Sequence, residues 1–494
     1  MSTKSISINS ILIREQKRYS LFDLVNIFGL SEQEIKILLK KLKLYNIVKT
    51  VKNSIRQKQS FELLDDDIEN VEVLSDSSEY LYVFTYVGVI IVSGLVIKCY
   101  PKYIFDHDNP IKELKLVLKV IEKFNKNEQI IKLQNNILDD IASNKIAAML
   151  YFLNDYYDNG IYANISNTIE INGNGEINWD KTINETYALI NQNRPYYIDL
   201  FTKKKLNNEF DYFKRLHKTI LTICSKYLET CGLLELFDLL AVNLSDEDLD
   251  DFGETDYILR QIQKEISIQF NTRKQLLLKS FYSFIANDGG KFNRSDFSLY
   301  GTSSFHVIWE KACATVIDNH LERNLEELPL LHGLSEDYID YSKTSLINLI
   351  ERPKWAVRNT CKLHESEKTL IPDLINLNIN SNGELQFLIF DAKYYNLCLN
   401  EKTLSGQPGV ESISKQYLYQ LAYKDFIEKQ NINIVKNCFL FPSETDQFMN
   451  IGEVYLEMLD NLGLEKIQLI MLPSHVVYEC FLSNKRLDLS KLDL

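Results

Sequence analysis

The stretch IPDLINLNINSNGELQFLIFDAKYYN, residues 371–396, decides the fold expected for the C-terminal part of the chain. Two β-prone segments flank Asn382-Gly383, a dipeptide typical of two-residue hairpin loops. If those two residues form the loop, Asp373 lies opposite position 392, within one residue of Asp391. The predicted hairpin therefore brings two carboxylates together.

Lys393 follows Asp391 by two residues, so both side chains project from the same face of the strand. The strand before them, FLIF, is expected to be buried, and buried charges are costly unless they pair or bind a metal. Two carboxylates and an ammonium group fit Mg²⁺-dependent phosphodiester hydrolysis, with Mn²⁺ as a substitute metal. We expect Asp373 and Asp391 to bind the metal together with the Ala392 carbonyl. Lys393 either orients the attacking water or stabilises the pentavalent phosphate. The alternative is a surface hairpin with an ordinary Asp–Lys pair.

Two further segments are predicted to be helices that supply polar groups to this cluster. Residues 304–317, SFHVIWEKACATVI, carry an apolar face with Glu310 near its edge, where the carboxylate could approach the metal. Residues 414–427, SKQYLYQLAYKDFI, place Gln416, Gln420 and Tyr423 on one side of a helix. A solvated glutamate and ordinary core side chains remain the alternatives for these two helices.

Charge is distributed unevenly along the chain. The 494 residues carry a formal net charge of -13, which excludes a protein that coats nucleic acid with its whole surface. Residues 14–58 nevertheless hold eleven Lys or Arg and four Asp or Glu, a local balance of +7. Ser31 and Glu34 form a predicted capping box before a lysine-rich amphipathic helix. Residues 1–75 are therefore predicted to be a helix-turn-helix or winged-helix-like module that reads DNA or a partner, and the alternative is a small helical domain with a solvated lysine face.

Cysteine usage and hydropathy indicate a cytoplasmic protein with no membrane partner. The eight cysteines include no CxxC pair, which is typical of reduced core thiols, and the N-terminus lacks the pattern of a signal peptide. Residues 80–97 contain no charge, but their Val, Ile, Tyr and Phe content and the Ser93-Gly94 turn favour a buried β-hairpin.

The chain is thus expected to be a multidomain α/β protein. Its middle region, residues 76–290, combines this β-rich segment with a helical domain, and residues 291–494 form a mixed-sheet core. The elements expected in that core are helices around 304–320 and 412–429 and strands at 371–377, 385–393, 434–441 and 466–472.

The segment FLIFDAKYY, with IPDLI before it and KQYLYQLAY after it, resembles the LlaJI family of restriction endonucleases and, more distantly, McrC nuclease subunits. TYVGVIIVSGLVIKCYPKY, GEINWDKTI and YGTSSFHVIWEKAC resemble further elements of those proteins, so the resemblance covers roughly residues 80–485. It implies an McrC-like middle region and a PD-(D/E)xK endonuclease domain in residues 291–494. The catalytic positions that it implies are Asp373, Asp391, Lys393, the opening-helix acid Glu310, which also becomes a metal ligand, and the helix glutamine Gln420.

The same resemblance implies a restriction endonuclease subunit that cleaves double-stranded DNA in antiviral defence. It implies an McrB-like AAA+ GTPase partner and cognate DNA methyltransferases in the same restriction-modification system. The sequence contains no GxxxxGK[ST] motif, so nucleotide use would come from the partner. A stand-alone nuclease is one alternative. A catalytically silent DNA-binding or scaffold subunit is another, and the intact Asp373, Asp391 and Lys393 set argues against it.

Overall fold

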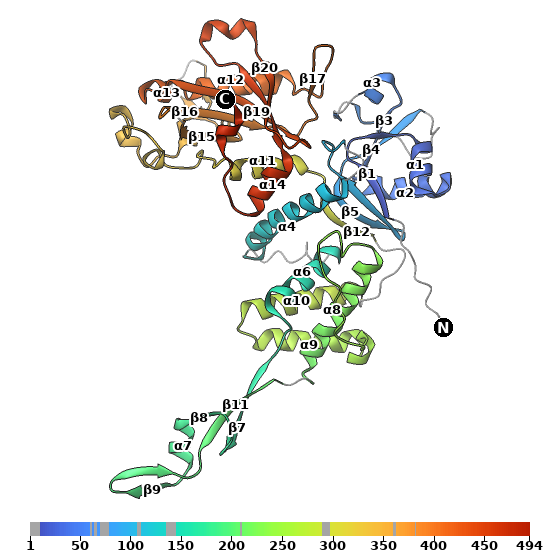
Figure 1. The fold of residues 1–494 in the computed structure, drawn as a ribbon, viewed down its shortest axis with the longest axis vertical. Coiled ribbons are helices and arrows are strands. Elements are labelled where there is room, and N and C mark those ends of the chain that lie inside the picture. The colour runs from blue at the N-terminus through green and yellow to red at the C-terminus, as the bar shows by residue number, and fades with distance from the viewer. Residues whose placement is uncertain are drawn as a thin grey trace. The chain divides into compact units, whose positions relative to one another are not determined.

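The computed structural model describes residues 10–59, 62–63, 67–69, 79–105, 110–134, 145–207, 210–288, 297–358, 362–380 and 382–494 (Figure 1). They form two compact units, one between residues 145 and 299 and the other from residues 10–134 together with 300–494. Each unit is a mixture of helices and sheets, so the predicted multidomain α/β class is confirmed.

The N-terminal part of the second unit contains two capped helices, α1 (Leu21–Phe28) and α2 (Glu32–Leu44). The predicted capping box of α2 is confirmed, because the Glu34 N–H donates to Ser31 Oγ and the Ser31 N–H donates to Glu34 Oε2. Strand β4 (Tyr80–Phe84) pairs with both β2 (Arg18–Tyr19) and β3 (Val48–Lys52). Helix α3 (Ile55–Gln59) follows β3.

The uncharged segment forms the predicted buried hairpin. Strands β5 (Val87–Val92) and β6 (Leu95–Tyr100) pair antiparallel around Ser93-Gly94, and every residue of β5 is buried. Within the described ranges, no helix is long and apolar enough to cross a membrane. Strand β1 (Ser10–Arg14) runs parallel to β6, and β12 (Phe297–Thr302) completes a sheet with the order β1-β6-β5-β12.

The unit between residues 145 and 299 consists of a helical bundle and an arm. Helices α6 (Lys145–Asn159), α8 (Tyr212–Thr230), α9 (Thr255–Ile268) and α10 (Thr272–Asp288) form the bundle. Arg273 pairs with buried Asp155 at 2.6 Å, and the Nδ1 atom of fully buried His217 accepts from the Tyr162 N–H at 2.9 Å. These contacts join α6, α8 and α10 into one body.

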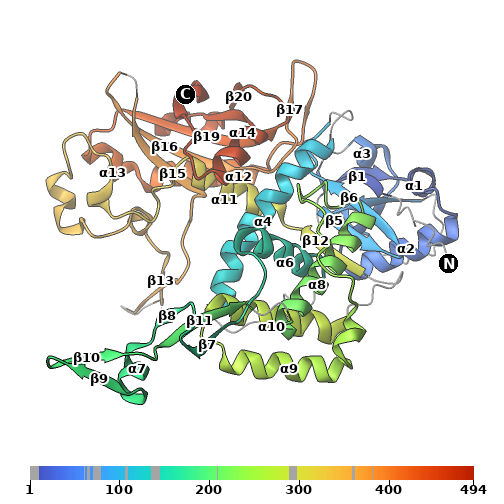
Figure 2. The same ribbon diagram turned by 60° about the horizontal axis from the view of Figure 1, so that its bottom comes forward.

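The arm projects away from the bundle, with strands β9 and β10 at its far end (Figures 1 and 2). Strand β11 (Phe201–Asn207) pairs with β7 (Ile165–Ile171) and β8 (Glu176–Ile177), and α7 (Trp179–Glu185) leads to the β9–β10 hairpin (Ala188–Asn191 and Arg194–Tyr197).

The C-terminal part of the second unit is built on a five-stranded mixed sheet with the order β15-β16-β19-β21-β20. Strands β16 (Leu385–Ala392), β19 (Ile434–Ser443) and β21 (Ile467–Pro473) are parallel, while β15 (Leu374–Ile379) and β20 (Met449–Val454) are antiparallel edges. The helices are α11 (Phe305–Val316), α12 (Val410–Ala422), α13 (Lys424–Lys429) and α14 (Ser474–Leu482). All the elements expected here are present, whereas β20 and α14 were not predicted.

The side chains of β16 alternate between two apolar layers. Phe387 and Ile389 join a buried cluster with Tyr423 and Phe426 of the α12–α13 segment, and the Phe387 and Tyr423 rings lie 5.3 Å apart. By the same alternation, Asp391 continues the row of Phe387 and Ile389 at the carboxyl end of the strand. The apolar core therefore holds in place the strand that carries this acid. The remaining elements are α4 (Pro110–Gln134), two small hairpins, β13 (Lys354–Ala356) with β14 (Leu363–Glu365) and β17 (Cys398–Leu399) with β18 (Leu404–Ser405), and short 3-10 turns.

Candidate active site

The β15–β16 hairpin aligns the two predicted aspartates. Leu374 pairs with Phe390, so Asp373, one residue before β15, lies opposite Asp391. The predicted alignment of Asp373 with position 392 was wrong by one residue. The hairpin is closed by the Asn380 N–H donating to the Glu384 carbonyl at 2.9 Å, so the loop is longer than the two residues expected. In the observed register the two aspartates lie directly opposite each other, whereas the sequence predicted an offset of one residue.

Lys393 and Asp391 form an ion pair with 2.9 Å between Nζ and Oδ2. Oδ2 of Asp373 accepts the Ala392 N–H at 3.1 Å, which ties the first acid to the strand that carries the second. Oδ1 of Asp391 is buried and has no hydrogen-bond partner among the residues that the structure describes. A buried carboxylate oxygen without a donor is costly unless a cation satisfies it.

The pKa shifts of the neighbouring acids also favour a cation at this cluster. Burial raises the pKa of Asp373 well above its ordinary range, the neighbouring Asp391 and Glu310 raise it further, and Lys393 acts in the opposite direction. The pKa of Glu310 is also raised, first by burial, with Lys393 lowering it and Asp391 raising it. Closely spaced carboxylates in a partly buried site are stabilised in their ionised form by a bound divalent cation.

The fold thus brings four predicted site residues close enough to influence one another's charge: Asp373, Asp391, Lys393 and Glu310. Over the described ranges, no group of three His, Cys, Asp or Glu side chains is close enough to hold a metal ion. The ready ligands are the two aspartates, and the carbonyl of Ala392 lies between Asp391 and Lys393 in the chain. This donor set of hard oxygens suits Mg²⁺, which keeps several water ligands of its own.

Gln420 does not join the cluster. It is buried, and its Oε1 accepts the Glu465 N–H at 3.1 Å, in the loop before β21. Gln416, one turn earlier, is fully buried and donates to the carbonyls of Ile389 and Cys438, both at 3.3 Å. Gln416 therefore fixes α12 to β16 and β19. Both glutamines were predicted on one side of this helix, but only strand pairing reveals which one meets the active-site strand.

A buried polar network was missed by the sequence analysis. We call it the Lys102 network, and it contains Glu15, Glu62, Lys102, Tyr394 and Asn396. The Lys102 ammonium pairs with the Glu62 carboxylate and lies 4.7 Å from the centre of the Tyr394 ring. The Tyr394 hydroxyl donates to Glu15, and Asn396 donates through Nδ2 to the Lys102 carbonyl at 2.9 Å and through its N–H to Glu62 Oε1 at 3.0 Å.

The Lys102 network holds the segment that directly follows Lys393. Lys102 is only 3% exposed, and Glu15 is similarly buried. Burial raises the pKa of Glu15, and Lys102, Tyr394 and the Lys102 N–H act against that rise. The only signal in the sequence was the PKY element at residues 101–103, because the partners of Lys102 lie between 40 and 294 residues away from it.

Comparison with known proteins identifies the family. The LlaJI restriction endonuclease family matches residues 86–330 and 336–475. The chain belongs to the LlaJI restriction endonuclease family. This LlaJI-family chain is 30% identical over 422 residues to the type II restriction enzyme BsuMI component YdjA of Bacillus subtilis, covering 84% of this chain and 83% of that protein.

Two solved structures also resemble the LlaJI-family chain. One contains Thermococcus gammatolerans McrB AAA+ hexamers with bound McrC, at 13% identity, covering 96% of this chain and 100% of that chain with a TM-score of 0.33. The other is the Thermococcus gammatolerans McrBC complex, at 15% identity, covering 58% of this chain and 89% of that chain with a TM-score of 0.22.

Proposed function

We propose that this LlaJI-family chain is the DNA-cleaving subunit of a restriction system, with a PD-(D/E)xK core that hydrolyses phosphodiester bonds of double-stranded DNA with Mg²⁺. The observation that carries the proposal is the alignment of Asp373 with Asp391, with Lys393 paired to Asp391 at 2.9 Å and one Asp391 oxygen left without a donor. An arrangement of this kind is costly in a structural hairpin and useful in a metal-dependent hydrolase.

Each residue has a role that its position allows. Asp373 and Asp391 would hold the metal, with the Ala392 carbonyl as a third oxygen donor. When bound, Mg²⁺ supplies charge neutralisation at the phosphate and a more acidic water. Lys393 is placed to orient the attacking water or to stabilise negative charge on the phosphate. Glu310, at the edge of α11, would complete the acidic surroundings, and Gln416 keeps the strand in position.

The test is cleavage of unmethylated phage DNA by the full-length protein with Mg²⁺, with and without a neighbouring AAA+ protein and GTP. We expect Asp391→Ala and Lys393→Ala to reduce the cleavage rate at least about 100-fold, and Mn²⁺ to replace Mg²⁺. Glu365→Gln, an exposed acid on β14, is the control and should cut like the wild type. Undiminished cutting by the two active-site variants would refute the assignment. Absence of cutting under every condition would favour a silent scaffold.

A partner is the second part of the proposal, and we take it to be an McrB-like AAA+ GTPase. The arm carries apolar side chains that a monomer gains nothing by exposing: Tyr187 is 97% exposed, Ile190 76% and Ile198 68%. Exposed apolar side chains grouped in and beside one hairpin, here β9–β10, are typical of an interaction surface. We expect Tyr187→Ser with Ile190→Ser to abolish stimulation by the GTPase while leaving unstimulated cleavage unchanged.

Phe270→Ser is the matched control for the arm, because Phe270 is 96% exposed but lies between α9 and α10. Equal loss of stimulation in the control, or full stimulation of the arm variant, would contradict the assignment of the arm. Cognate DNA methyltransferases are the remaining proposed components. If they are present, DNA methylated by the same system should resist cleavage. The cleavage rates of methylated and unmethylated substrate test this directly.

A further inference from the structure

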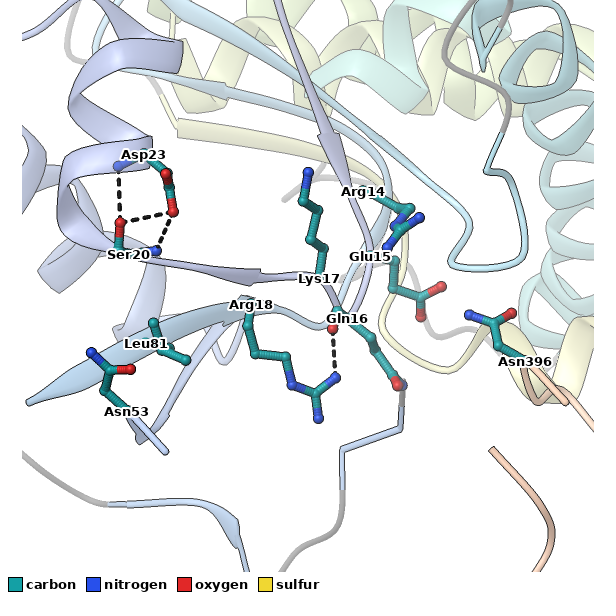
Figure 3. Close-up of a pocket in the computed structure, with 10 residues that line it drawn as sticks. All are labelled: Arg14, Glu15, Gln16, Lys17, Arg18, Ser20, Asp23, Asn53, Leu81 and Asn396. Carbon is teal, nitrogen blue, oxygen red and sulfur yellow. Dashed lines mark hydrogen bonds between the residues drawn. The ribbon is translucent and has the colours of Figure 1, made fainter. Parts of the chain in front are cut away.

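A cavity of about 380 Å³ opens at the turn between β1 and β2 (Figure 3). Most of its wall comes from residues 14–23, and Asn396 reaches it from the separate segment that follows β16. The lining is polar, and it includes one aliphatic side chain and no aromatic one. The lining residues are Arg14, Glu15, Gln16, Lys17, Arg18, Ser20, Asp23, Asn53, Leu81 and Asn396.

The two acids in the wall are satisfied by their own neighbours. Glu15 accepts from the Tyr394 hydroxyl and the Lys102 N–H, and Asp23 accepts from the N–H and hydroxyl of Ser20. Both carboxylates are therefore held by donors of the protein itself, and the wall carries three cations against these two acids.

The cations in the wall are not equivalent. Arg18 is engaged by the Gln16 carbonyl at 2.8 Å and by further acceptors. Arg14 and Lys17 instead rest on aromatic rings, with Arg14 4.8 Å from the centre of Phe105 and Lys17 5.3 Å from the centre of Tyr19. In the described part of the chain, neither of them forms an ion pair with a carboxylate. The cavity thus presents two positive charges that lack a negative partner.

The cavity is close to the candidate active site along the chain. Asn396 is three residues after Lys393, so their Cα atoms are at most roughly 11 Å apart. Asn396 also bonds to Lys102 and Glu62, so one wall of the cavity belongs to the Lys102 network. A group bound there would lie beside the segment that carries the catalytic lysine.

We propose that this cavity binds a backbone phosphate of the DNA that is cleaved, at a position outside the metal site. The inference rests on the proposed nuclease function and adds a contact outside the metal site. Phosphate is favoured over a base because the cavity wall carries cations but no aromatic face for stacking. A chain with a net charge of -13 needs local cations to hold a polyanion, and Arg14 and Lys17 supply them at this cavity.

The test measures binding without cleavage. Full-length protein in EDTA is titrated with a fluorescent duplex of about 40 base pairs over a series of salt concentrations. Each phosphate contact contributes about 0.9 to the slope of log affinity against log salt, so Arg14→Ala with Lys17→Ala should lower the slope by up to about 1.8. At 0.1 M salt that corresponds to a roughly 60-fold loss of affinity.

Two variants serve as controls. Lys52→Ala with Arg56→Ala removes the same charge from the same part of the chain, where both side chains are about three-quarters exposed and only loosely paired. It should leave the slope nearly unchanged. Arg14→Lys with Lys17→Arg keeps the charges and should keep most of the affinity.

The outcomes separate this proposal from the one on which it rests. Equal slopes for the cavity variant and its control, or no duplex binding by the wild type, would overturn the phosphate site. Tighter binding of free pyrophosphate than of duplex would show that a small anion, rather than DNA, occupies the cavity, and would also overturn it. If DNA binding depends on Arg14 and Lys17 but no metal-dependent cleavage occurs, the phosphate site stands and the proposed nuclease function is refuted.

Discussion

Substitution of Lys102 by Met tests whether the Lys102 network holds the active site in place. The change removes the ammonium group and keeps most of the apolar stem. The lost contacts are the ion pair with Glu62 and the positions over the rings of Tyr394 and Tyr395, at 4.7 Å and 5.3 Å. The Lys102 backbone bonds to Glu15 and Asn396 do not depend on the side chain.

The size of the effect follows from burial. Breaking a buried ion pair by removing one partner costs about 3–5 kcal/mol, because the other charge is left uncompensated. The Glu62 side chain is 14% exposed and can be partly hydrated, so we expect the lower end, about 3 kcal/mol, in the free energy of unfolding. Lys102→Met with Glu62→Gln removes both charges and should recover about half of that loss.

Two measurements read the result. Urea unfolding can be followed by the fluorescence of Trp309, which is fully buried in the same unit, whereas Trp179 and Trp355 are 53% and 69% exposed. Under conditions where the variant stays folded, we expect kcat for DNA cleavage to fall at least about 10-fold with little change in KM, because misplacement of the segment after Lys393 affects chemistry more than binding. A variant with wild-type stability and wild-type kcat would refute the reasoning.

Three further predictions concern other parts of the fold. Burial lowers the pKa of His217 from 6.5 to about 4, so the neutral imidazole contributes fully to stability above pH 6.5, and this contribution is lost as the pH falls toward 4. At pH 5 we expect the free energy of unfolding to be lower by about 2 kcal/mol, a loss that a His217→Gln variant should not show. Asp373→Asn should raise the stability of the metal-free protein by about 1 kcal/mol, because it removes a buried acid beside other acids, and it should abolish the rise in Tm caused by Mg²⁺. A less stable variant, or a variant whose Tm still rises with Mg²⁺, would count against the metal site. Gly88→Ala should cost about 3 kcal/mol or more, because the new Cβ would lie 2.2 Å from the Tyr300 carbonyl oxygen at a φ of +139°, whereas Gly94→Ala, in open space at a φ of +77°, should cost only about 1 kcal/mol in the same urea titration.

Local patterns predicted the elements that their own residues determine. The β5–β6 hairpin follows from its β-branched residues and the Ser93-Gly94 turn, and the start of α2 follows from Ser31 and Glu34. The proximity of Asp373 and Asp391 was also predictable, because a hairpin brings its two ends together whatever its loop length.

Features set by tertiary packing were not predictable in the same way. The register of β15 and β16 depends on a loop whose geometry Asn382-Gly383 does not fix alone, so the expected alignment was one residue off. Gln416 and Gln420 differ only in which strand or loop lies beneath them. The Lys102 network escaped notice because nothing in the sequence near Lys102 shows that Glu62 and Tyr394 lie beside it.

The long separation between the partners in the Lys102 network has a consequence for synthesis of the protein. Glu15 and Tyr394 are 379 residues apart, and at roughly 5–20 residues per second the ribosome needs about 20–80 s to pass from one to the other. Once residue 102 has been made, the nascent chain has Glu15 and Lys102 but still lacks Asp391, Lys393 and strand β21. The Lys102 network and the candidate active site are therefore completed only when translation is almost finished, and an interrupted product cannot form them.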